Sequence, residues 1–155
     1  MGGAVNGGTA IAAWYLHEND VFKIARSHYD QATATWTQQA DVYNYPDIFT
    51  NPSTQIPYTA ALDNGRYVIG FDVVSISPTQ LHSTFAVVYN SDGSVHTSQT
   101  NLWPSSTANR EELYGLVSLP GGRFVSLIFE FAALPRFIIT VTVNAVFCDS
   151  DLCDY

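Results

Sequence analysis

The stretch ALDNGRYVIGFDVV, residues 61–74, decides the fold class, because SLPGGRFVSLIFEF, residues 118–131, repeats its pattern. Each copy reads leucine, two turn formers, glycine, arginine, an aromatic residue and valine. The glycine can supply a positive φ that residues with a Cβ resist, and the aromatic and β-branched residues after it favour extended backbone. Each stretch therefore predicts a tight turn that opens a β-strand.

The two copies differ in the alternation of their apolar residues. The first strand is expected to bury Tyr67 and every second residue after it. The second is expected to bury Val125 and every second residue after it, and Val125 is one place further from the shared glycine than Tyr67 is. A duplicated site would keep its register, because a slip of one residue turns every side chain over. We interpret the repeat as a recurring way to start a strand and not as a duplicated functional site.

Alternating apolar residues between turn signals recur along most of the chain. They predict an all-β fold, an antiparallel β-sandwich or jelly roll of about eight strands. Residues 1–8 are expected to be a Gly-rich linker or an artificial start, and residues 9–155 a single domain whose first thirty residues have no clear pattern. The expected core comprises Tyr67, Ile69, Phe71, Phe85, Val87, Leu127, Phe129, Ile139, Val141 and Val143.

The composition excludes several classes of partner. Of 155 residues, 46% are hydrophobic and 13% charged, and the net charge is −8. Nucleic acids and anionic membranes both attract cationic surfaces, so we expect neither as a partner. No apolar run reaches the roughly 20 residues of a membrane-spanning helix, and no phosphate-binding or dinucleotide-binding motif predicts a cofactor.

Aromatic residues gather in polar loops. Tyr43, Tyr45, Phe49 and Tyr58 lie among Asn, Pro, Thr and Gln, and Trp103 lies in another loop. Flat rings beside amide side chains are typical of surfaces that recognise carbohydrate or protein. The alternative is that these rings cover the ends of the sandwich.

The C-terminal stretch FCDSDLCDY concentrates two thiols and three carboxylates. Cys148 and Cys153 could form a short disulfide or remain thiols. A metal site with Asp149, Asp151 and Asp154 is a weak candidate, because the spacing matches neither a zinc motif nor a calcium loop.

No local signature of catalysis is present. The chain has no G-x-S-x-G elbow and no H-E-x-x-H pair, and Glu111 and Glu112 are adjacent, which suits paired acid and base poorly. We expect a protein that is not an enzyme. A hydrolase site assembled from scattered residues is the alternative.

From Ala61 to Phe147, the order LDNGRYVIGFDVV, STFAVVYNSDGS, LVSLPGGRFVSLIFEF and FIITVTVNAVF resembles the β-sandwich protruding domains of tombusvirus-like coat proteins. The resemblance implies a non-enzymatic capsid module on the virion surface, or an extracellular one, that acts in assembly and attachment to a glycan or protein receptor. These 155 residues contain no basic RNA-binding arm and leave no room for a shell domain, so the resemblance implies an excised surface domain. A carbohydrate-binding module, free or excised from an enzyme, is the alternative function.

Self-association is expected, because so apolar a domain leaves apolar side chains exposed. Phe124 and Ile128 in one strand, and Ile138 and Val146 in the last, are expected to point outward. Such faces could pair across a two-fold axis in a homodimer.

Overall fold

The computed structural model describes residues 1–19, 21–45, 56–75, 81–103, 109–133, 139–148 and 153–154. Within these ranges every regular element is a β-strand, every strand pairing is antiparallel, and no helix is long and apolar enough to cross a membrane. The strands are β1 (Gly2–Asn6), β2 (Thr9–Glu18), β3 (Val21–Asp30), β4 (Thr35–Gln38), β5 (Tyr43–Asn44), β6 (Tyr58–Ala61), β7 (Tyr67–Ser75), β8 (Leu81–Tyr89), β9 (Val95–Asn101), β10 (Asn109–Leu119), β11 (Arg123–Ala133), β12 (Ile139–Cys148) and β13 (Cys153–Asp154). The all-β, antiparallel prediction is confirmed.

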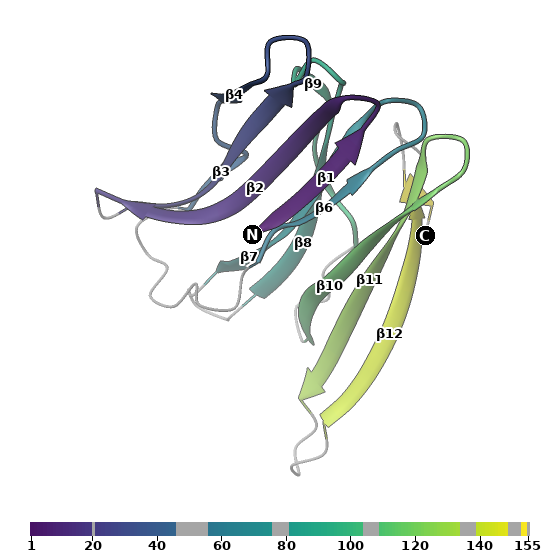
Figure 1. Cartoon of the computed structure of the whole chain (residues 1–155). Helices are drawn as coiled ribbons and strands as arrows, with labels where there is room; N and C mark the ends of the chain where they lie inside the picture. Colours follow the sequence, from purple (N-terminus) through teal and green to yellow (C-terminus); the bar gives the residue numbers. More distant parts are fainter. Residues whose placement is uncertain are drawn as a thin grey trace.

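The strands form three sheets, each a meander in chain order. The first sheet runs β1-β2-β3-β4 with β5 also paired to β3, the second runs β6-β7-β8-β9, and the third runs β10-β11-β12-β13. The sheets pack face to face, with the second in the middle, and their first strands β1, β6 and β10 lie next to one another (Figure 1). The expected packing of antiparallel sheets face to face is confirmed, and a third sheet gives the chain more strands than the expected eight.

The second sheet is buried on both faces. Tyr67, Ile69 and Phe71 pack against the first sheet, in a cluster with Ile11 and Ile24. The opposite face contributes Val68, Ala86 and Val88 to a second cluster, against the third sheet. A sheet covered on both sides reads as a nearly continuous apolar run, and YVIGFDVV is such a run.

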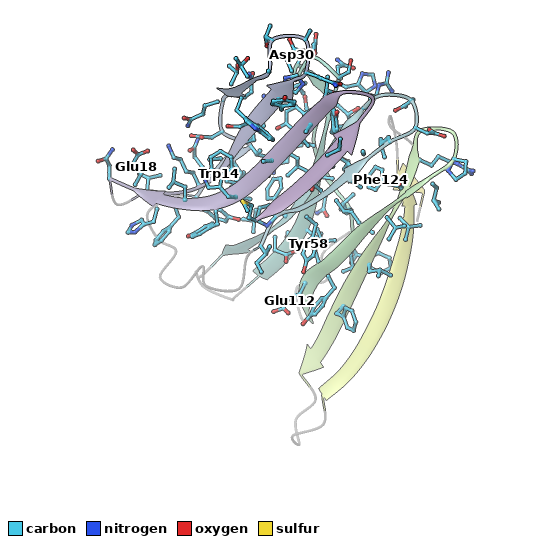
Figure 2. All side chains as sticks on the ribbon, in the orientation of Figure 1. Trp14, Glu18, Asp30, Tyr58, Glu112 and Phe124 are labelled. Carbon is cyan, nitrogen blue, oxygen red and sulfur yellow. The ribbon has the colours of Figure 1, made fainter. Side chains whose placement is uncertain are left out.

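The prediction of which alternate residues of β11 are buried is wrong. Phe124 and Ile128 are buried between the second and third sheets, whereas Leu127 and Phe129 are half-buried on the far face. Figure 2 shows Phe124 on the side of β11 that faces the second sheet. Both parities of β11 are apolar, so alternation alone did not reveal which one faces a neighbouring sheet.

The repeated turn occurs three times, not twice. Val5-Asn6-Gly7-Gly8-Thr9 joins β1 to β2 as the two copies join β6 to β7 and β10 to β11, and the same interval of 57 residues separates Val5 from Leu62 and Leu62 from Leu119. The glycine in the fourth position has a positive φ in every copy: 94° at Gly8, 85° at Gly65 and 75° at Gly122. The turn opens the second strand of each sheet, which confirms its interpretation as a strand start. The parity argument against repetition does not hold, because Tyr67 and Phe124 occupy the same place in their copies and both are buried.

The N-terminal residues are part of the fold. Residues 1–8 were expected to be a linker, but Gly2–Asn6 form β1, and Ala4 is buried in the cluster between the first two sheets. Of the expected core, Tyr67, Ile69, Phe71 and Val87 are buried and Phe85 is partly buried, all between the first and second sheets. Ile139, Val141 and Val143 lie in β12, whose side chains are outside the described part of the structure.

Candidate functional site

A polar cleft opens between the first and second sheets at the end of the molecule that carries the β3–β4 and β8–β9 turns. Its volume is about 470 Å³, which is within the range of pockets for small molecules. Asp30, labelled in Figure 2, marks the first of these turns. The lining residues are Thr9, His28, Asp30, Thr33, Thr35, Thr37, Gln39, Ser91 and Asp92.

The edge strand β4 supplies one wall of the cleft. Its register pairs Thr35 with Asp30 and Thr37 with His28, so both threonines share the face of β3 that is turned toward the second sheet. Trp36, between them, pairs with Tyr29 on the opposite face. Thr33 also belongs to this wall: its Oγ1 lies 2.7 Å from the Oγ1 of Thr35. The Thr33 hydroxyl donates to the Asp30 carboxylate at 3.3 Å.

Two buried side chains of β3 fix the floor of the cleft. His28 Nε2 donates to the carbonyl oxygen of Ser91 at 2.6 Å. Arg26 donates from Nε to the Ala40 carbonyl at 3.1 Å and from a terminal nitrogen to the Gly93 carbonyl at 3.0 Å, and its guanidinium lies 4.1 Å from the centre of the Tyr89 ring. Burial lowers the pKa of Arg26, and the nearby Tyr89 opposes that shift. These contacts hold the β8–β9 turn of the second sheet against β3 of the first.

The second wall is the β8–β9 turn itself. The Asp92 carboxylate accepts from the Ser94 hydroxyl at 2.6 Å and from the Ser94 backbone N–H at 2.8 Å, both through Oδ1. These hydrogen bonds lower the pKa of Asp92 from its ordinary 3.8, with a smaller contribution from His28. Because its pKa is lowered, the Asp92 carboxylate lines the cleft as an ionised acceptor.

The polar groups that line the cleft are suited to hydrogen bonding. Its walls offer hydroxyl, amide and carboxylate groups, which together donate and accept. Among the described residues, His28 is the only one that brings an imidazole to the lining, and its Nε2 already donates to the Ser91 carbonyl and so holds a loop in place. In the described ranges, no three His, Cys, Asp or Glu side chains lie close enough to hold a metal ion.

The aromatic residues predicted to form a binding surface do not share one surface. Tyr45 is buried between the first and second sheets, where its hydroxyl donates to the Asp72 carbonyl at 2.7 Å, and Tyr43 packs on the same cluster. Tyr58 and Trp103 pack on the opposite face of the second sheet. Phe49 lies outside the described residues. The four described rings lie against the cores between the sheets, and ligand binding by them stays a prediction.

The C-terminal candidates are only partly described. The register of β12 and β13 places Cys148 directly opposite Cys153, and Asp154 opposite Phe147. Asp149 and Asp151 lie outside the described residues, as does Ile138, while Val146 is the register partner of Ser126. The disulfide stays a prediction that the backbone pairing favours.

The sequence did not predict the cleft, because the alternation in the run ATATWT is typical of any half-buried strand. The run ATATWT places Thr33, Thr35 and Thr37 on one parity, and all three are exposed. The available signal was the alternation itself: one side of the run carries three threonine hydroxyls and no apolar residue.

Comparison with known proteins gives a likeness of fold. No family model matches the chain, and no curated protein matches it. Among solved structures, an α-L-arabinanase from Penicillium chrysogenum, complexed with arabinobiose, superposes with a TM-score of 0.61 at 11% identity over 91% of this chain. The match spans 41% of the arabinanase chain, and at this identity it shows a shared fold alone. The resemblance to viral protruding domains gains no support from these comparisons and stays a prediction.

Proposed function

We propose that this chain binds carbohydrate in the polar cleft and does so without catalysis. The observation that carries the proposal is the composition of the cleft walls, where hydroxyl, amide and carboxylate groups surround about 470 Å³. A saccharide presents many hydroxyls that each donate and accept, and a wall of mixed donors and acceptors satisfies them. The volume suits a ligand of one or two sugar rings.

Two further observations support this proposal. The cleft is held rigid by Arg26 and His28, so a ligand would meet walls that are already in place. The fold resembles that of an arabinanase solved with arabinobiose, so pentose oligosaccharides are a reasonable first class of ligand. The outer, receptor-binding role expected from the sequence would be one use of such a site.

The test is a binding titration of the whole chain against arabinobiose and a panel of mono- and disaccharides. The double variant Thr35→Val, Thr37→Val removes two hydroxyls from the cleft wall and conserves side-chain volume. We expect it to weaken binding at least about tenfold. Ser98→Ala, which removes an exposed hydroxyl from β9 outside the cleft lining, is the matched control and should bind as the parent does.

Two outcomes would contradict the proposal. Absence of binding to any saccharide at millimolar concentration would exclude the function. Binding that survives the double valine variant but is lost in Trp103→Ala would move the site to the opposite face of the second sheet, where Trp103 packs.

A further inference from the structure

The first sheet has an apolar face with no partner among the described residues. In β2, Ile11 and Ala13 face the second sheet, so Ala12 and Trp14 point the other way. Tyr29 and Trp36 extend this outer face across β3 and β4, with ring centres 5.3 Å apart. Trp36 is 54% exposed. Figure 2 shows Trp14 on the broad face of β2.

The third sheet has a matching apolar face at the other end of the stack. Phe124 and Ile128 face the second sheet, so Val125, Leu127 and Phe129 lie on the outer face of β11. On β10, Val117 pairs with Val125 and is 52% exposed. The Tyr114 ring packs at a tilt against the Phe129 ring, with ring centres 4.3 Å apart.

The residues on these two outer faces are equivalent to residues of the second sheet that contact its neighbouring sheets. With the interval of 57 residues, Val125 in the third sheet corresponds to Val68 in the second, which packs against the sheet that follows it. Ala12 in the first sheet corresponds to Ile69 in the second, which packs against the sheet that precedes it. The outer faces of the first and third sheets are therefore the two halves of one more contact between sheets.

Four-stranded meanders that stack face to face with their first strands inward are the blades of a β-propeller, and such rings close with about four to eight blades. Three blades are too few to close, and two copies of three fall within the range. We propose that two copies of this chain close a six-bladed ring, in which the third sheet of each copy packs its outer face on the outer face of the other's first sheet.

The symmetry of this ring sets it apart from an ordinary dimer. Each contact joins two different surfaces, and the assembly closes because both contacts form at once. The apolar outer faces supply the attraction. The charge of −8 on each chain opposes it, so added salt should favour the dimer.

The experiment is light scattering with size-exclusion chromatography on the 155-residue chain at tens of micromolar. We expect a single species at twice the 17.0 kDa of the monomer, and a larger dimer fraction at high salt. Leu127→Lys on the third sheet and Ala12→Glu on the first should each give a folded monomer. Val95→Lys, which replaces an exposed apolar residue on the rim strand β9, should remain dimeric. Circular dichroism and thermal melting establish that each variant is folded.

Mixing the two monomeric variants gives the decisive result. In a mixed pair one contact carries both substitutions and the other carries neither, so we expect partial recovery of the dimer. A monodisperse monomer of the parent chain would overturn the proposal and assign the faces to another protein or another segment. An open polymer without a limiting mass would overturn closure. A dimer that Leu127→Lys breaks and Ala12→Glu does not would show a two-fold contact between third sheets instead.

Discussion

At the scale of single residues, Asp72 joins the three sheets. It lies in β7 of the second sheet, where its carboxylate accepts from the Thr84 hydroxyl at 2.9 Å and from the Leu113 backbone N–H at 3.0 Å. Leu113 begins the irregularity in β10 at which the register with β11 shifts. The backbone carbonyl of Asp72 accepts from Tyr45, which packs against the first sheet. One buried acidic residue therefore satisfies polar groups from both neighbouring sheets.

We expect Asp72→Ala to lower the free energy of unfolding by about 3 kcal/mol, because it leaves the Leu113 N–H and the Thr84 hydroxyl buried without an acceptor. Asp72→Asn, which keeps one acceptor oxygen, should cost less. Asp63→Ala is the matched control, because the exposed Asp63 carboxylate also accepts backbone N–H groups, from Gly121 and Gly122, where water can replace it. Urea denaturation measures all three. Equal losses for Asp72→Ala and Asp63→Ala would contradict the argument from burial.

Gly65 and Gly122 hold the same place in two copies of the turn but differ in their surroundings. Both have a positive φ, so alanine at either position is strained by about 1–2 kcal/mol. A Cβ at Gly65 would meet no atom within 4 Å, whereas a Cβ at Gly122 would lie 2.2 Å from the Asn64 side-chain nitrogen. We expect Gly122→Ala to destabilise more than Gly65→Ala in urea denaturation. Asn64→Ala should reduce the difference, and if it does not, the contact with Asn64 is not its cause.

At the scale of elements, the sequence was sufficient where a strand is bounded by turns. The turns within residues 61–74 and 118–131 were expected to open strands, and β7 and β11 begin directly after them. Which face each strand buries was less predictable, because β7 is apolar on both sides and so is β11. Alternation identifies a buried face only when the other face is polar. The first thirty residues showed no clear pattern, because the turn between β1 and β2 has valine and threonine where the other copies have leucine and arginine.

The pairing of β12 with β13 places Cys148 opposite Cys153, which favours the predicted disulfide. Directly opposed residues of an antiparallel pair have Cα atoms about 4.5–5.5 Å apart, which is within the range that a disulfide spans. We expect Cys148 and Cys153 to resist alkylation until a reductant is added, after which two thiols should react. Cys148→Ser is the control, because it should leave Cys153 reactive without reductant. Two reactive thiols in the untreated oxidised protein would contradict the disulfide.

At the scale of the whole molecule, the contact between the first and second sheets is rich in tyrosine, and burial changes the ionisation of several of these rings. Burial raises the pKa of Tyr15 from its ordinary 10.0 to about 12, and it also raises the pKa of Tyr43, Tyr45, Tyr58 and Tyr89. Tyr15, Tyr43, Tyr45 and Tyr89 belong to the contact between the first and second sheets, and Tyr58 to the contact between the second and third. The contact between the first and second sheets therefore depends most on neutral tyrosines.

The sign of the pH dependence follows from these shifts. Because each pKa is higher in the folded chain than in the unfolded chain, the unfolded chain loses its protons first as the pH rises past 10. The stability that neutral tyrosine contributes is complete below pH 10 and is lost as the pH approaches the folded value, about 12 for Tyr15. We expect alkaline unfolding in this interval, with tyrosinate absorbance and circular dichroism changing together. Tyr15→Phe should move the midpoint to higher pH without weakening the protein at neutral pH, because the buried Tyr15 hydroxyl has no hydrogen-bond partner among the described residues. Titration of all the tyrosines near pH 10 with the strand signal intact would show that water reaches both contacts.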